Sequence, residues 1–213
     1  MKTKLKLFVV ILLTIFCIGC VSLKPTVTVD SQNMFTSTSP NLQLILDRSL
    51  KYAGHFEILQ REQGWSYNNE YYIFNNGSKI LSVILIKRIP FGSDYHWLPI
   101  KIKKGENGVL IVQKTVKLAG KYWKTYIQEV SLNTKEADAF YSKGIDVERR
   151  YIAKCYARNI SDKIHVRVLY AETLEGYEDD IKQYRRLNTL TNEQAELLNS
   201  FLERAEKSIT FIK

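Results

Sequence analysis

The sequence is poor in the residues that build metal centres and disulfides. Its 213 residues include three cysteines and three histidines, and no histidine stands at metal-ligand spacing. Two of the cysteines, Cys17 and Cys20, lie in the amino-terminal segment, and the chain after Cys20 has no CxxC pair. The chain also lacks a GxSxG nucleophile elbow, a nucleic-acid-binding motif and any internal repeat. These absences argue against a zinc domain, an α/β-hydrolase, a repeat protein and a nucleic-acid-binding protein. We expect no cofactor and no metal.

The amino terminus has the pattern of an export signal. Three lysines precede an apolar run from Leu7 to Ile18, which a single Thr interrupts. Extended to Val21, the run reaches only 15 residues, whereas a membrane-spanning helix needs roughly 20. The pattern therefore favours a signal peptide over residues 1–19, with a membrane span as the alternative.

The run ends in the tetrapeptide Cys17-Ile18-Gly19-Cys20. A small residue directly before a cysteine at this place resembles the lipobox of bacterial lipoproteins, although that family usually has Leu where Cys17 stands. The resemblance implies lipidation of the Cys20 thiol, cleavage before Cys20 and acylation of the new amino group. Two or three acyl chains hold a protein stably on a membrane. Ordinary signal cleavage, which would release a soluble protein, is the alternative.

The same resemblance implies a location in the cell envelope. Val21 stands where the family's inner-membrane retention signal has Asp, so we expect the outer membrane in a bacterium with two membranes. Loss of residues 1–19 removes three lysines and lowers the formal net charge from +9 to +6. A mild positive charge suits anionic surfaces. The expected partners are the membrane, through the lipid, and an envelope protein or an anionic glycan or lipid.

Composition divides the mature chain into two parts. Residues 20–39 are rich in Ser, Thr, Val and Pro without periodicity, which predicts a lipidated cysteine followed by a flexible tether. Residues 40–213 have the length of a single globular domain with a real core. Cys155 has no disulfide partner in this domain, and we expect it to fill the core as a small apolar residue.

Turn signals alternate with β-type runs through most of the domain. Asn75 to Ser78 separates two such runs, Tyr71–Phe74 and Lys79–Arg88, and its Asn-Gly dipeptide predicts a hairpin. Similar patterns predict strands over residues 98–103, 109–118 and 122–130, and a hairpin made of 147–158 and 163–170.

Helical patterns are concentrated in the carboxyl third. A short helix is predicted over Asn133–Ser142, a second over 174–184, and a third from a capping box at Thr191 to about Ile212. The order of strands first and helices last predicts an α+β fold. We expect a mainly antiparallel β-sheet, a meander of hairpins, covered by C-terminal α-helices.

The hairpin of residues 147–170 supplies the main candidate surface. Pairing Arg158 with Lys163 places Cys155 on a coherent apolar face, and a one-residue slip would pair apolar with charged positions. The opposite face then collects basic residues as a possible anion or partner surface, the alternative being that their side chains simply extend into solvent. These residues are Arg150, Lys154, Arg158, Lys163, His165 and Arg167.

Other clusters have simpler explanations. Ser93, Asp94 and His96 suggest a catalytic triad, but a triad is assembled by the fold and not by adjacency, so a turn is favoured. The acidic residues between Glu172 and Asp180 suit a helix N-terminus better than a cation site. Aromatic residues from Trp65 onward either line a carbohydrate or peptide groove or fill the core.

The sequence therefore favours a lipid-anchored envelope lipoprotein whose domain is a non-catalytic binding or assembly module. The alternative is an envelope hydrolase or transferase. That alternative requires a histidine within hydrogen-bond reach of a serine or a carboxylate.

Overall fold

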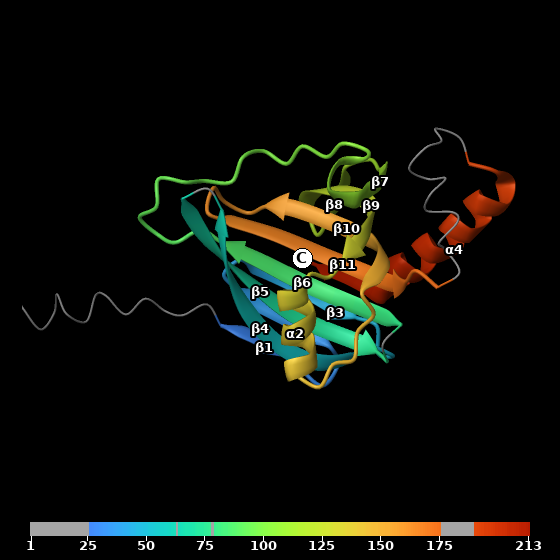
Figure 1. The fold of residues 1–213 in the computed structure, drawn as a ribbon, viewed down its shortest axis with the longest axis horizontal. Helices are drawn as coiled ribbons and strands as arrows, with labels where there is room; N and C mark the ends of the chain where they lie inside the picture. Colours follow the sequence, from blue (N-terminus) through green and yellow to red (C-terminus); the bar gives the residue numbers. More distant parts are fainter. Residues whose placement is uncertain (1–25, 63, 78, 176–189) are drawn as a thin grey trace, which may run out of the picture.

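Two antiparallel β-sheets face each other in the structure (Figure 1). The computed structural model describes residues 26–213 except 63, 78 and 176–189. The larger sheet has the strand order β4-β5-β6-β11-β10-β9-β7, with β8 paired to β9, and the smaller sheet has the order β1-β2-β3-β12. The larger sheet contains β4 (Lys51–Glu62), β5 (Trp65–Asn76), β6 (Ile80–Arg88), β7 (Val109–Val112), β9 (Lys121–Ser131), β10 (Arg150–Asn159) and β11 (Ile164–Thr173), with β8 (Val116–Leu118) beside β9; the smaller contains β1 (Val27–Val29), β2 (Met34–Thr38), β3 (Asn41–Leu46) and β12 (Ile209–Ile212).

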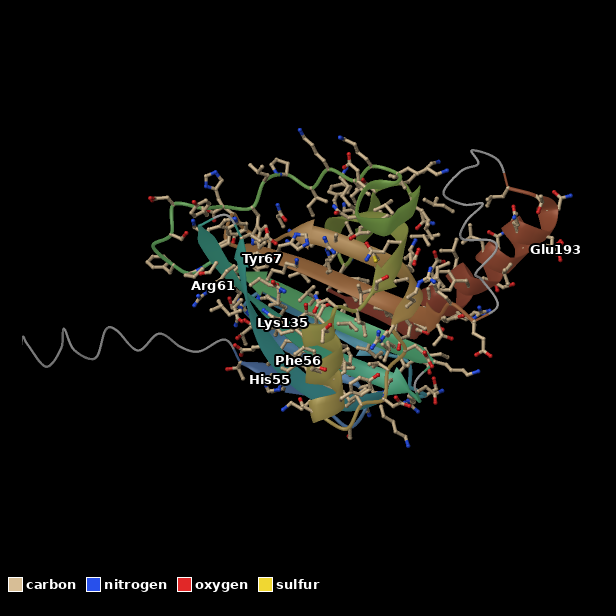
Figure 2. The ribbon with its side chains drawn as sticks, in the orientation of Figure 1. His55, Phe56, Arg61, Tyr67, Lys135 and Glu193 are labelled. Atoms are coloured by element: carbon tan, nitrogen blue, oxygen red, sulfur yellow. The ribbon has the colours of Figure 1, made fainter. Side chains whose placement is uncertain are left out.

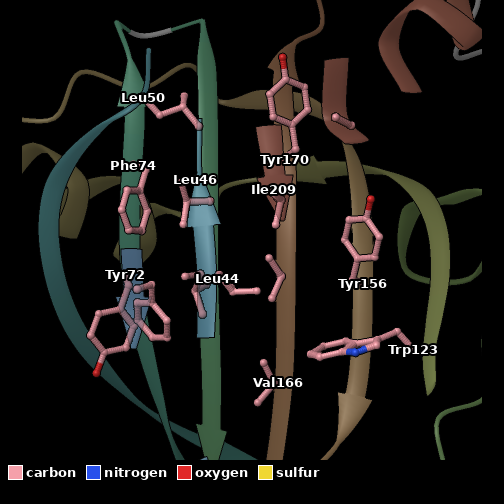
Figure 3. Close-up of a cluster of buried hydrophobic side chains, with 14 of the residues drawn as sticks. Leu44, Leu46, Leu50, Tyr72, Phe74, Trp123, Tyr156, Val166, Tyr170 and Ile209 are labelled. Carbon is pink, nitrogen blue, oxygen red and sulfur yellow. The ribbon is translucent and has the colours of Figure 1, made fainter. Parts of the chain in front are cut away.

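The face of the larger sheet that meets the smaller sheet, here called the inner face, carries the main core. Phe35 and Leu44 of the smaller sheet pack with Tyr72, Ile84 and Val168 of the larger one. Helix α4 (Asn192–Ser208) adds further apolar side chains to the same cluster. Figure 3 shows part of this cluster, with Leu44 of the smaller sheet beside Tyr72 of the larger one.

The opposite face of the larger sheet, the outer face, is also covered. Helix α2 (Thr134–Ser142) lies across it (Figure 1), and Phe140 of the helix contacts Phe56 of β4, with ring centroids 5.2 Å apart. Segment 89–108, which ends in the one-turn 3₁₀ helix η1 (Glu106–Gly108), packs Ile100 and Ile102 against the same cluster. Figure 2 shows Phe56 of β4 beside α2, and Tyr67 in the part of β5 that lies away from α2.

Gly108 lets segment 89–108 lie close to the sheet. Its φ of 77° suits glycine, and a Cβ at this position would stand 2.5 Å from the carbonyl oxygen of Glu129 in β9. Because real Cβ atoms do not approach backbone so closely, any other residue would push the segment away from β9.

The predicted fold class is wrong. Most described residues outside loops lie in antiparallel strands, and the described part of the chain has only two α-helices, α2 and α4. A second β-sheet, together with α4, covers the inner face where C-terminal helices were expected. The fold is mainly β because the chain supplies its own second apolar sheet from residues 27–46 and 209–212.

The predicted tether is wrong for residues 27–38. They form β1 and β2, and Phe35 is buried between the sheets. The last helix begins at its Thr191 capping box as predicted, but it ends at Ser208. Ile209–Ile212 instead pairs with β3 as an edge strand, because its apolar side chains cover the end of the inner core there.

Several local predictions are confirmed. The hairpin at Asn76-Gly77 joins β5 to β6, and α2 begins with a capping box at Asn133. The predicted strand over residues 98–103 is wrong, since this part of the chain has no regular structure. Most of the predicted helix over 174–184 lies outside the described residues. Within the described ranges, no helix has the length and apolarity needed to cross a membrane.

Two phenylalanines offer a matched test of the two-sheet core. Phe35→Ala removes a fully buried ring from between the sheets, whereas Phe91→Ala truncates a fully exposed ring in segment 89–108. We expect Phe35→Ala to lower the free energy of unfolding by about 3–5 kcal/mol and Phe91→Ala to change it by less than about 0.5 kcal/mol. Urea unfolding followed by circular dichroism measures both. Equal losses in the two variants would contradict the packing of the smaller sheet on the larger one.

Candidate functional site

The structure does not gather the six predicted basic residues on one surface. The hairpin of β10 and β11 forms as predicted, but Cys155 pairs with Leu169 and Asn159 with His165, which shifts the predicted register by three residues. A shift by an odd number moves one strand's side chains to the opposite face. Arg150, Lys154 and Arg158 therefore lie on the inner face, and His165 and Arg167 on the outer face.

Three of the four other residues have protein partners. Arg150 donates two hydrogen bonds to Glu129 Oε1, at 2.9 and 2.6 Å. Lys163 lies in the turn between the strands and donates from Nζ to the carbonyl oxygens of Ser93 and Tyr95. Lys154 is buried on the inner face and donates to Gln113 Oε1. Arg158 lines a cavity between the sheets. None of these four contributes to an outer basic stripe.

The outer face instead holds a compact group of basic residues, here called the cationic cluster: Lys87, His165 and Arg167. Lys87 of β6 pairs directly with His165 of β11, and Arg167 is the next residue of β11 on the same face. Diagonal neighbours in an antiparallel pair lie roughly 7–8 Å apart, within reach of long side chains. Within the described residues, neither Lys87 nor Arg167 has a carboxylate at ion-pair distance. Two cations thus lie side by side, and the nearest compensation that the described residues give Lys87 is the more distant charge of Glu62 and Glu136.

His165 is a neutral part of this cluster. Its Nδ1 lies 2.7 Å from Asn159 Oδ1, an acceptor, so Nδ1 carries the proton. Its Nε2 is then free to accept the hydrogen bond that Arg167 Nε donates at 3.3 Å. Burial, followed by the charges of Arg167 and Lys87, lowers the pKa of His165 to about 3. The imidazole therefore fixes the position of the Arg167 guanidinium and adds no charge near neutral pH.

Lys87 lies over the ring of Tyr67. Its Nζ lies 5.2 Å from the centroid of the Tyr67 ring. Burial and then the nearby charge of Arg167 lower the pKa of Lys87 to about 8. An anion bound beside Lys87 would reverse this shift, because it would stabilise the ammonium form.

Two tyrosines lie beside the cluster and face carboxylates. The hydroxyl of Tyr67 donates to Glu62 at 2.8 Å, and that of Tyr71 donates to Glu136 of α2 at 2.7 Å. Burial raises the pKa of Tyr67 to about 12 and also raises that of Tyr71. Both phenols therefore stay protonated and donate hydrogen bonds to the two carboxylates beside the cluster.

An aromatic cluster adjoins the cations at the end of the sheet: Trp65, Tyr67, Tyr95 and Trp97. The Trp97 ring lies 5.6 Å from the His165 ring and 5.5 Å from the Trp65 ring, and the Tyr95 ring stacks on Trp65 at 5.5 Å. Tyr95 is exposed and Trp65 is partly exposed. Trp65 and Tyr67, for which a groove or a core position was open, thus lie beside two of the predicted basic residues, whereas Tyr72 fills the inner core.

Segment 89–108 closes one side of this site. It leaves a cavity of about 70 Å³ lined by His165, Arg167, Lys101, Lys103 and Tyr126, among others. Pockets for drug-sized molecules are about 300–1,000 Å³. This cavity has room for one small charged group and not for a whole sugar or peptide.

One further polar group lacks a partner nearby. Asn69 pairs with Lys87 across β5 and β6, is 3% exposed, and its Oδ1 makes no hydrogen bond. Buried polar groups are nearly always hydrogen-bonded, and an unsatisfied one costs about 1–3 kcal/mol. Asn69 therefore adds an unused polar atom to the same site as the two unpaired cations.

The site suits binding better than acid–base chemistry. The His165 imidazole is fully occupied, and Cys155 nearby is buried, which raises its thiol pKa to about 12. His55 stacks on Tyr72, and His96 contacts the backbone oxygen of Asp94. Among the hydrogen bonds of the described residues, no histidine meets a serine hydroxyl or a carboxylate. The geometry required by the hydrolase alternative is not found there, nor is any group of three or more His, Cys, Asp or Glu suited to a metal.

Sequence reasoning missed Lys87, Asn69 and Trp97 as site residues. Lys87 follows an apolar run in β6 and resembles the exposed end of a strand, while Trp97 lies in the loop that was interpreted only as a turn. The pairing of β6 with β11 places Lys87 beside His165. Because that pairing joins residues about 80 positions apart in the chain, no local sequence pattern could have shown it.

The low pKa of His165 predicts a specific pH dependence of stability. In the unfolded chain a histidine has a pKa near 6.5, so between pH 6.5 and about pH 3 the unfolded state binds one proton more than the native state. This histidine therefore makes stability fall as the pH drops below 6.5, by about 1.4 kcal/mol per pH unit. We expect His165→Gln to remove this contribution in urea unfolding at pH 4, 5 and 6. Identical slopes for wild type and variant would show that His165 takes up a proton in the native state.

Comparisons with protein-family models, with curated proteins and with solved structures found no match to this chain. The function is therefore inferred from the residues of the site and from the amino-terminal sequence.

Proposed function

We propose that the protein is a lipid-anchored lipoprotein of the cell envelope that binds an acidic glycan through the cationic cluster. The observation that carries the binding proposal is the pair Lys87 and Arg167, two half-buried cations on one face without a carboxylate at ion-pair distance in the described residues. Like charges at neighbouring positions of a sheet destabilise it. An anion bound between the two cations would remove this repulsion and stabilise the folded protein.

The surroundings of the pair favour an acidic sugar as the ligand. The small cavity beside His165 and Arg167 has room for a single carboxylate, phosphate or sulfate group. Lys101 and Lys103 add positive charge to its lining, although Lys103 is paired with Glu106, which also lines it. Trp97, which contacts His165, also contacts Trp65, and the exposed ring of Tyr95 stacks on the partly exposed Trp65. The stacked pair offers a flat apolar surface for a sugar ring. Arginine suits this role because its planar guanidinium can bind a carboxylate through two hydrogen bonds.

The anchor is proposed from the amino-terminal sequence. The lipobox-like ending at Cys20 supports lipidation there, and the residue after it supports sorting to the outer membrane in a two-membrane bacterium. Acyl chains on Cys20 would keep the cationic cluster close to the anionic glycans and lipids of the envelope. Binding and location thus support each other chemically, and each is tested separately.

Anchoring predicts that Cys20→Ser abolishes labelling by a clickable fatty-acid probe and moves the protein out of the membrane fraction. Cys155→Ala is the matched control, because it removes a buried cysteine. We expect that control to keep both the label and the membrane association. Labelling that persists in Cys20→Ser and disappears in Cys155→Ala would contradict the lipobox assignment.

Binding predicts discrimination between sugars that differ in one charged group. Glucuronate should bind to the protein and glucose should not, as measured by calorimetry at low ionic strength. Lys87→Met and Arg167→Met should each weaken glucuronate binding roughly 10- to 100-fold, since a hydrogen bond to a charged group contributes about 1.5–3 kcal/mol. Lys117→Met, a change of the same charge at an exposed position of β8, should leave binding unchanged.

A second readout separates a binding role from a structural one. Because Lys87 is repelled by Arg167 in the free protein, Lys87→Met should raise the thermal stability of the free protein while it weakens binding. Loss of stability together with loss of binding would instead indicate a structural lysine. Equal affinity for glucose and glucuronate would exclude the acidic-glycan proposal.

A further inference from the structure

The inner face contains a second, separate opening. A cavity of about 420 Å³ lies between β8 and the C-terminal strand β12, at the end of the core. Most of its lining is apolar and comes from strands of both sheets: Val116, Leu118, Tyr156, Ile209 and Phe211, with Lys154. Its volume is within the range of small-molecule pockets, about 300–1,000 Å³. We call it the inner pocket.

Lys154 is the unusual residue of the inner pocket. It occupies the middle of β10, is 4% exposed, and has Ile127 and Tyr170 as its neighbours across the sheet. Its ammonium donates to Gln113 Oε1 and lies 5.4 Å from the centroid of the Tyr156 ring. Within the described residues it has no carboxylate at ion-pair distance. A buried charge without a counterion is costly, so this position favours a ligand that supplies one.

The adjoining space contains a buried hydrogen-bond donor. A cavity of about 270 Å³ shares Leu118 and Phe211 with the inner pocket and is also lined by Trp123. The Trp123 side chain is 2% exposed, and its Nε1–H has no acceptor in the described part of the chain. Phe211 lies between the two spaces, with its ring 4.8 Å from Trp123 and 5.3 Å from Tyr156. Figure 3 shows Trp123 and Tyr156 on neighbouring strands.

We propose that the inner pocket binds a small amphiphile with one carboxylate, such as a medium-chain fatty acid, with the carboxylate on Lys154. The apolar lining takes the chain, and the ammonium of Lys154 takes the head. This site is independent of the cationic cluster, because Lys154 points to the inner face of the sheet and Arg167 to the outer face.

The charges around the pocket limit the ligand to a single negative charge. Glu206 of α4 lines the pocket and is exposed, and its charge is felt by Lys154, yet the two do not form an ion pair. A phosphate with two charges would meet repulsion from Glu206. A cationic head group would be repelled by the buried ammonium of Lys154, so cationic amphiphiles are not expected to bind.

Three ligands of equal chain length test the proposal. Octanoate, octylamine and octanol are titrated below their micellar concentrations against the full-length protein in lipid nanodiscs, and empty nanodiscs measure ligand dissolved in lipid. We expect one octanoate per chain, no binding of octylamine, and at least tenfold weaker binding of octanol. Octylamine or octanol binding as tightly as octanoate would overturn the proposal.

Two variants locate the site. Lys154→Met keeps the length of the side chain and removes the charge, so octanoate affinity should fall at least tenfold while the fold is kept. Leu118→Trp places a larger ring in the wall shared by the two cavities and should abolish binding of octanoate and octanol alike. Lys135→Met, at an exposed position of α2 on the outer face, is the control and should change nothing. Unchanged octanoate binding in both Lys154→Met and Leu118→Trp would refute the site.

Discussion

Coverage of the larger sheet on both faces is the constraint that governs the rest of the structure. Strands β6 and β10 are buried along most of their length, so each side chain must find its partner inside the protein. Two charged residues of these strands meet this condition by pairing with an opposite charge near a strand end, Arg88 with Glu70 and Arg150 with Glu129. Lys87, Arg167 and Lys154 do not. They are cations in partly or fully covered positions without a carboxylate contact among the described residues, and both proposed sites are built on them.

Local chemistry predicted the parts of the fold that depend on a few neighbouring residues. The Asn-Gly turn between β5 and β6 requires only a positive φ at Gly77, and the two capping boxes require only a side chain that reaches three residues along the chain. The hairpin of β10 and β11 was also predicted from its own turn. In each case the free energy that selects the structure is contributed within about ten residues, so the sequence pattern contains it.

The wrong predictions share one physical cause. Which segments cover each face of a sheet depends on residues far apart in the chain, and a local sequence pattern does not contain this information. The register of β10 and β11 was chosen on the assumption that one face is apolar and the other solvated. Since both faces are covered, Ile152 and Tyr156 are buried as well as Tyr151 and Cys155, and alternation does not distinguish the registers. Ile209 and Ile212 continue the apolar spacing of α4, yet pairing with β3 makes them a strand. The aromatic part of the site was noticed, but only the pairing of β6 with β11 brings it to the cations.

Cys155 shows why the unpaired cations are better explained by ligands than by the protein's own chemistry. It lies on β10 next to Lys154 and pairs with Leu169, two residues from Arg167, so positive charge acts on its thiol from two sides. Cations of this kind activate a cysteine when its thiol is accessible. Here burial raises the thiol pKa to about 12 and outweighs both Arg167 and Lys154, so the thiol stays protonated. Their charges serve no ion pair and no nucleophile among the described residues. These uncompensated charges support the two proposals, in which an anion from outside the chain binds on each face of the sheet.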